Sequence, residues 1–221
     1  MTIKNFSESD RIFHSDGHRT GQMAADQGLR PEDITDGIET IQRSMDSLNE
    51  AILRNAETQG VHVACKKGCD FCCYQPVFIN NFEILRLIRH IREKFTGTQI
   101  SAILKKAAAK NLAVSRMPES KMLLHKAACP LLANGACSVY EARPMACRIY
   151  LSTSLDSCRH FFSHPGDKHK YPMLLEFPLR AGRMLNEGFA AAMRQNGQPL
   201  REYRIEEGLL LFLQKPNLHP E

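Results

Sequence analysis

The sequence contains eight cysteines, and their number and close spacing make them the residues most able to do chemistry. Thiolate is a soft ligand, and four thiolates are the usual donor set for a zinc ion or an iron–sulfur cluster. Such dense clustering is not typical of cysteines that merely fill a core. We therefore predict a metal site built from Cys65, Cys69, Cys72, Cys73, Cys129, Cys137, Cys147 and Cys158.

The first four cysteines fall within nine residues, from Cys65 to Cys73. The Cys69-Asp-Phe-Cys72 step lets two sulfurs reach one metal from a single turn, and Gly68 permits the tight backbone that this requires. Cys72 and Cys73 are adjacent, so their side chains diverge. Either one of the two does not bind metal, or the two address different metals. The second block follows much later in the chain, so the fold must bring the two blocks together.

Composition and the first residues of the chain predict which partners and which cellular compartment to expect. The net charge of +5 is mild, no block of like charge occurs, and aromatic residues make up 7% of the chain, so we expect no nucleic-acid partner. No apolar leader opens the chain, and the longest apolar run is the five residues from Leu209 to Leu213, so we expect no membrane span and a cytoplasmic protein. In a reducing cytosol, closely spaced cysteines favour metal binding over disulfides.

Hydrophobic periodicity predicts a mainly α fold, with a compact helical domain, a loop-rich cysteine site and helical extensions at both ends. Residues 1–28 carry three glycines and no periodicity, and we expect a mobile tail. Residues 29–60 form an amphipathic helix whose stripe includes Ile34, Ile38, Ile41 and Met45, packed on the cysteine domain or on a second copy of the chain. Residues 61–165 form the metal-binding domain, and residues 166–221 form a C-terminal helical extension that packs on the core.

Two further helices are expected between the cysteine blocks. Asn80 or Asn81 caps the first, and Gly97 stops it. The second starts near Thr98 and carries three lysines opposite its apolar face, which we interpret as its solvated side: Lys105, Lys106 and Lys110. No segment shows convincing strand alternation.

Basic and imidazole side chains flank the cysteine blocks. Four thiolates carry net negative charge, which nearby cations can offset. Four cations are placed in the sequence to do so, although ordinary surface charge is an equal alternative: Lys66, Lys67, Arg143 and Arg148. His160, His164 and His169 could add nitrogen ligands, but we expect the cysteines to dominate the site.

The cysteine pattern resembles the YkgJ-type cysteine-cluster family, described as a zinc- or iron-chelating domain and sometimes as iron–sulfur cluster-containing. The resemblance covers about residues 63–150 and rests on Cys65-x3-Cys69-x2-Cys72-Cys73, Cys129-Pro-Leu-Leu, Gly135-x-Cys137-x-Val139-Tyr140 and Arg143-Pro144-x-x-Cys147-Arg148, with Glu83 also at a recurrent position. It implies chelation by the seven motif cysteines, without Cys158. A relative, the flagellin lysine N-methylase, carries a similar domain within a longer enzyme, but this chain shows no glycine-rich cofactor loop.

These observations predict a cytoplasmic metal-binding protein that holds an iron–sulfur cluster, of the 4Fe–4S type, or else zinc. The expected role is electron transfer or assistance to an oxidoreductase, with a protein redox partner. The alternatives are a zinc-stabilised interaction module and an accessory to protein modification. No independent catalytic motif is present, so the sequence leaves open whether the protein is an enzyme.

Overall fold

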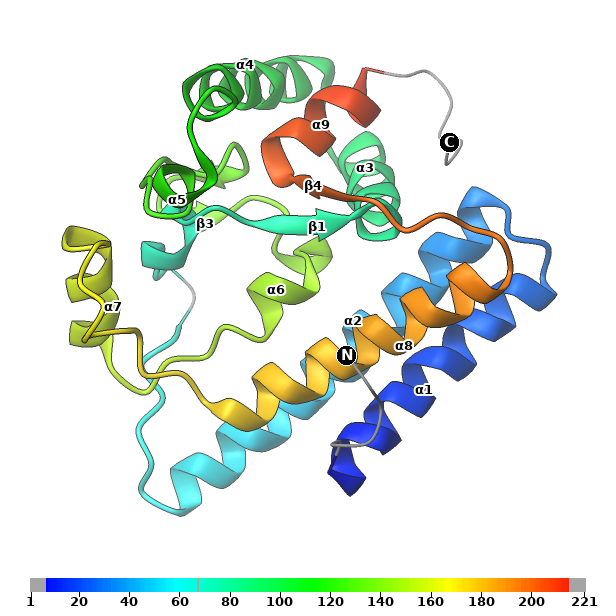
Figure 1. Ribbon diagram of the computed structural model, residues 1–221, viewed down its shortest axis with the longest axis horizontal. Helices are drawn as coiled ribbons and strands as arrows, with labels where there is room; N and C mark the ends of the chain where they lie inside the picture. The colour runs from blue at the N-terminus through cyan, green and yellow to red at the C-terminus, as the bar shows by residue number, and fades with distance from the viewer. Residues whose placement is uncertain (1–6, 67, 215–221) are drawn as a thin grey trace.

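Three long helices lie side by side at one end of the computed structural model, which describes residues 7–66 and 68–214 (Figure 1). They are α1 (Glu8–Asp26), α2 (Pro31–Thr58) and α8 (Glu176–Gln195). The predicted mainly α class is confirmed. Lys67, the first six residues of the expected tail and residues 215–221 of the expected C-terminal extension lie outside the described residues.

Helix α2 is the amphipathic helix that the periodicity predicted. Pro31 occupies its first turn, and the side chain of Asp33 accepts a hydrogen bond from the Arg30 N–H at 3.0 Å. The stripe residues Ile34, Ile38 and Met45 are fully buried. They pack within this chain against α1, α3 and α8, and α3 belongs to the predicted metal-binding domain of residues 61–165.

The mobile tail expected over residues 1–28 is wrong for most of its length, because Glu8–Asp26 forms helix α1. The Ser7 side chain caps it by accepting the Asp10 N–H, and the Asp10 side chain accepts the Ser7 N–H in return. Its glycines mark a close contact with α8. A Cβ on Gly17 would lie 2.0 Å from the Leu185 carbonyl oxygen. The helix buries small residues instead of an apolar stripe, so periodicity could not reveal it.

The two helices expected between the cysteine blocks are present as α3 (Asn81–Lys94) and α4 (Gly97–Val114). Asn80 caps α3 by accepting the Glu83 N–H at 2.9 Å, as predicted. Strand β1 (Phe78–Asn80) pairs antiparallel with β4 (Glu202–Arg204), which the sequence did not predict. This pairing places the last helix, α9 (Ile205–Leu213), against α3 and α4.

The interpretation of Lys110 as a solvated residue is wrong. Its side chain is buried, and its Nζ lies 3.6 Å from Glu206 Oε2 on α9. Lys106 is exposed, but its Nζ donates to the Leu132 carbonyl at 2.9 Å. Helix α9 comes from the far end of the chain and covers this face of α4, which no local pattern could indicate.

The cysteine region is loop-rich, as predicted, and its regular elements are short. They are η2 (Phe71–Tyr74), α5 (Glu119–Met122), β2 (Leu132–Ala133), β3 (Ala136–Cys137), η3 (Tyr140–Ala142), α6 (Met145–Arg148) and α7 (Leu155–Ser163). One continuous hydrophobic core runs from α2 and α8 through α3 to α6 and α9. Among the described residues, no helix has both the length and the apolar character to span a bilayer.

Candidate metal centre

Seven of the eight cysteines line a single cavity of about 830 Å³. They come from both sequence blocks and are Cys65, Cys69, Cys72, Cys73, Cys129, Cys137 and Cys147. Cys158 does not line the cavity, but it lies on α7, which packs against η2 and so against the first block. The fold therefore brings the two blocks to one place.

Tight turns position the first block. Gly68 has φ of 90°, and the Cys69 N–H donates to the Lys66 carbonyl at 3.0 Å. The Cys73 N–H donates to the Asp70 carbonyl at 2.8 Å. Cys65 is anchored separately, because its Sγ accepts the Ser152 N–H at 3.1 Å. These bonds tie the start of the first block to the segment that follows the second block.

Backbone pairing joins the second block to the first. The Cys129 N–H donates to the Cys73 carbonyl at 2.7 Å, which puts these two residues side by side. Strands β2 and β3 then turn the chain back through Asn134 and Gly135, both with positive φ, and pair Leu132 with Cys137. A main-chain hydrogen bond thus joins Cys73 to Cys129, and the β2–β3 hairpin carries the chain on to Cys137.

Cys147 is positioned by a buried carboxylate. It lies on α6, and at the start of that helix Glu83 Oε1 accepts the Met145 N–H at 2.6 Å. Glu83 is 4% exposed, and burial raises the pKa of its carboxyl. The Asn186 amide donates to its second oxygen at 3.4 Å. Helices α3 and α8 therefore fix the helix that carries Cys147.

Burial dominates the acidity of these thiols. It raises the pKa of Cys65 and of Cys129 to about 11, and it raises that of Cys147 well above its usual value. The adjacent pair behaves differently. A hydrogen bond from the Cys73 thiol lowers the pKa of Cys72 to about 7, and the same bond raises that of Cys73. A metal must therefore displace protons from most of these thiols when it binds.

Repulsion between neighbouring thiolates raises these pKa values further, by less than burial does, and it shows which thiols lie near one another. The charges of Cys72 and Cys158 raise the pKa of both Cys65 and Cys69. Repulsion from Cys129 and Cys137 adds in the same way to the raised pKa of Cys73 and of Cys147. Cys72 also acts on Cys137 and Cys147. Cys72 therefore has thiol neighbours in both blocks.

Within residues 7–66 and 68–214, no three His, Cys, Asp or Glu side chains are arranged closely enough to hold a metal ion as they stand. The fit of a metal rests instead on donor chemistry. Seven thiols face one partly apolar cavity, and thiolates suit zinc and iron–sulfur centres rather than magnesium or calcium.

The histidines near Cys158 have other contacts. His160 Nε2 lies 2.8 Å from Asp167 Oδ2, and its ring stacks on His164 with centroids 4.7 Å apart. The backbone N–H of His169 donates to the same carboxyl group. None of the three lines the cysteine cavity.

Residues 64–170 match the CxxCxxCC family, whose model is described as "Putative zinc- or iron-chelating domain". The chain carries a domain of this YkgJ-type family. No curated protein and no solved structure matches the chain. The assignment supports chelation of zinc or iron by residues 64–170, which include all eight cysteines.

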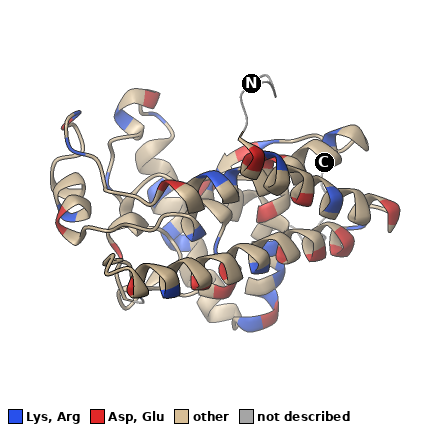
Figure 2. Ribbon diagram, turned by 90° about the horizontal axis from the view of Figure 1, so that it is seen from below, with Lys and Arg blue, Asp and Glu red and all other residues tan. Residues whose placement is uncertain are grey.

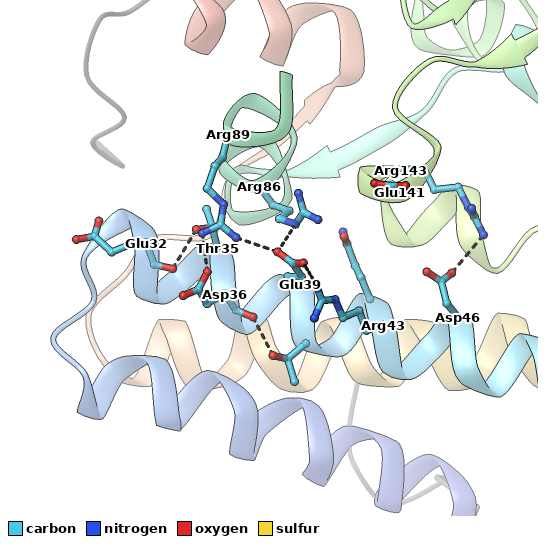
Figure 3. A network of polar contacts seen from close by, with 12 residues as sticks. Glu32, Thr35, Asp36, Glu39, Arg43, Asp46, Arg86, Arg89, Glu141 and Arg143 are labelled. Carbon is cyan, nitrogen blue, oxygen red and sulfur yellow. Dashed lines mark hydrogen bonds and ion pairs between the residues drawn. The ribbon is translucent and has the colours of Figure 1, made fainter. Parts of the chain in front are cut away.

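Two of the predicted cations, both arginines, line the cysteine cavity and are already paired. Arg148 is 1% exposed, forms an ion pair with Asp46 and donates its Nε–H to the Arg143 carbonyl at 2.8 Å. Arg143 lies 3.2 Å from the same carboxylate (Figure 3). Both guanidinium groups still lower the pKa of Cys137, against the larger effect of burial. Lys66 also lines the cavity.

The wider charge pattern is ordinary. Along the helices, basic and acidic residues are interspersed (Figure 2). On α2, Asp36 and Glu39 face Arg89 and Arg86 of α3 (Figure 3), with Arg89 2.9 Å and Arg86 3.2 Å from Glu39. These pairs fasten α2 to α3 beside the cavity.

Sequence reasoning missed the polar residues that α2 contributes to the cavity. Gln42 and Asn49 line it together with Asp46, and both amides are more than nine-tenths buried. A signal was present, because Gln42 follows Ile38 by four residues and Asn49 follows Met45 by four. Polar residues on the buried stripe of an amphipathic helix indicate that this part of the stripe contacts polar groups instead of the hydrophobic core.

Proposed function

We propose that the chelating domain holds an iron–sulfur cluster of the 4Fe–4S type and serves in electron transfer, or as an accessory to an oxidoreductase, in the cytoplasm. The observation that carries the proposal is the convergence of seven thiols from two distant blocks on one cavity. Thiolates of this number suit such clusters, whose role is one-electron transfer. A protein redox partner follows from that role.

The mutual effects of the thiols suggest how metal is shared. We assign Cys65, Cys69, Cys72 and Cys158 to one centre and Cys73, Cys129, Cys137 and Cys147 to the other. This division takes one of the two possibilities that the adjacent cysteines leave open, in which Cys72 and Cys73 address different metals. Apolar residues such as Leu131 and Val139 in the cavity wall limit the access of water, and Arg143 and Arg148 offset thiolate charge.

Paired substitutions test the division. Cys65→Ser with Cys158→Ser should remove the metal of one centre, and Cys129→Ser with Cys147→Ser should remove that of the other. Metal analysis of each folded variant should find about half of the wild-type metal. If either pair removes all of the metal, or if neither removes any, the division into two centres is wrong.

Anaerobic purification tests the kind of metal. We expect a coloured protein with iron and acid-labile sulfide in similar amounts and with reversible bleaching on reduction. A colourless protein that contains stoichiometric zinc and no sulfide, even from iron-replete anaerobic cells, would contradict the cluster.

A second function, structural zinc in an interaction module, is favoured by one specific observation. The elements that carry the motif cysteines are 3₁₀ turns, two-residue strands and a four-residue helix, which leave little regular hydrogen bonding to hold them. Zinc supplies folding free energy to such regions. This function predicts unfolding of the region by chelators and no redox activity.

A further inference from the structure

Positive charge is concentrated in the chelating domain. Residues 64–170 hold 17 of the 29 Lys and Arg residues of the chain, but only 7 of its 24 Asp and Glu residues. The other residues therefore carry an acidic excess. Some basic residues of the domain pair with acids outside it, as Arg89 does with Glu39 and Lys110 with Glu206. An asymmetry of this kind steers acidic partners toward the basic side of a molecule.

Two basic segments of the domain touch each other at the cysteine end. Lys126, just after α5, has its Nζ 4.0 Å from the centroid of the Phe161 ring on α7. The same ring lies 6.1 Å from the ring of Tyr171. The segments 119–126 and 155–173 therefore lie side by side, on the left of Figure 1. We call the exposed residues of these two segments the α5–α7 face.

The α5–α7 face carries unpaired positive charge. Three of its exposed lysines form no ion pair with any residue in the described ranges, and they are Lys121, Lys168 and Lys170. Two acids of the same segments already have partners, since Asp156 pairs with Arg159 and Asp167 with His160. Glu119 is the third acid, so Lys and Arg residues outnumber acids on this face.

Large apolar side chains are exposed on the same face. Leu123, Leu124, Tyr171 and Met173 are between 44% and 61% exposed. Interfaces between proteins commonly combine an apolar centre with a charged rim. Nucleic acids call instead for a denser basic surface that neutralises successive phosphates. The combination of apolar and basic residues therefore favours an acidic protein as the partner.

The α5–α7 face lies close to the thiols of the first cysteine block. On α7, Phe162 contacts Phe71 and Tyr74 edge-on, with centroids 5.7 Å and 5.1 Å away. Those two residues begin and end η2, which carries the adjacent cysteine pair. Helix α7 also carries Cys158. A protein bound to this face would be separated from these thiols by about one helix diameter, ~10 Å.

We propose that the α5–α7 face docks the acidic face of an electron-carrier protein. The exposed lysines pair with carboxylates of the carrier, and the exposed leucines and Tyr171 form the apolar centre of the interface. One electron passes between the carrier and the metal centre, so the oxidation of one balances the reduction of the other. This role rests on the proposed cluster, whereas docking itself depends only on the surface.

Binding of a defined acidic carrier tests the proposal. The probe is a plant-type 2Fe–2S ferredoxin, an acidic one-electron carrier, labelled with a fluorophore and titrated with the metal-loaded full chain. Fluorescence anisotropy should show saturable binding at about 20 mM salt. The affinity should fall at least about tenfold at about 200 mM salt, because salt screens the lysine–carboxylate pairs.

Charge reversal on both segments locates the interface. Lys121→Glu with Lys168→Glu should weaken binding of the probe at least about tenfold. Arg11→Glu with Arg201→Glu is the matched control, because it makes the same change of charge at two exposed positions outside the chelating domain. The control should bind within about twofold of the wild type, since its charges lie away from the interface.

Three outcomes would overturn the docking face. They are the absence of saturable binding by the wild type, an equal loss in the two paired variants, and tighter lysine-dependent binding of a labelled DNA or RNA oligonucleotide. Iron, sulfide and zinc are measured in the same samples. A zinc-loaded chain that binds the probe through these lysines would overturn the proposed cluster and support the docking face.

Discussion

The two ends of the molecule hold their shape by different means. At the helical end, α1, α2 and α8 run for many turns with capped starts, and glycines bring α1 and α8 into backbone contact. At the cysteine end, short turns and two-residue strands carry the motif thiols, most of them buried enough to resist ionisation. Packing therefore explains the shape of the first end, whereas at the second end we expect bound metal to supply part of the stability.

Removal of the metal should cause the largest loss of stability, and this loss should be confined to the cysteine end. Zinc-type thiolate sites contribute about 10–16 kcal/mol to folding in small domains. Hydrogen exchange of the metal-loaded protein, before and after anaerobic chelation, should show lost protection in residues 68–74 and 129–150. Helices α1 and α8 should keep theirs. Equal loss at both ends would show that the two ends do not differ in this way.

Substitution Gly188→Ala should break the helical end instead. Its Cβ would lie 2.0 Å from the His14 carbonyl oxygen, so α1 must move away from α8. We expect a loss of about 3 kcal/mol in the free energy of unfolding, measured by urea titration, with unchanged metal content. Gly97→Ala is the control, since nothing lies within 4 Å of the added carbon. A loss of metal in Gly188→Ala with normal stability would contradict this view of the helical end.

Glu83 tests the junction between the ends. Glu83→Leu removes the acceptor of the buried Met145 N–H and should cost about 2 kcal/mol of stability. It should also weaken metal retention, because α6 carries Cys147. Glu83→Gln keeps an acceptor oxygen and should recover more than half of the loss. If the two variants are equally unstable, the hydrogen bond to α6 is not what Glu83 provides.

A further effect concerns the pH dependence of metal affinity at the cysteine end. Burial raises the pKa of Cys65 and Cys129 to about 11, so these thiols are protonated in the metal-free protein at neutral pH. Metal must displace each proton, and its affinity should rise with pH from 6 to 8, by about tenfold per unit for each proton released. Zinc competition titrations with a chelator of known pH dependence measure this. An affinity that is flat with pH would mean that the thiols are already ionised.

Sequence patterns predicted what local chemistry determines. The stripe of Ile34, Ile38 and Met45 predicted α2, and the cap at Asn80 predicted α3, because both depend on nearby residues. The two cysteine blocks predicted one shared site, and the structure places seven of their thiols on one cavity. Metal ligation by these particular residues stays a prediction.

Features that depend on partners far away in the chain could not be predicted from the sequence. Gly17 indicated a flexible tail when read alone, although it is a contact point for α8. The pattern of α4 alone placed Lys110 on a polar face, but in the structure α9 covers that face. The burial of Gln42 and Asn49 depends on hydrogen bonds to Arg148, which lies about a hundred residues later in the chain. In each case the cause lies in a segment that the local pattern cannot include.

X-ray absorption at the metal edge of the anaerobically loaded protein tests the central claim most directly, since it reports the atoms bound to the metal. The account predicts a first shell of sulfur alone, with about four sulfurs at about 2.3 Å per metal, and a metal–metal distance if the centre is a cluster. A first shell dominated by oxygen or nitrogen would contradict a site made by these cysteines.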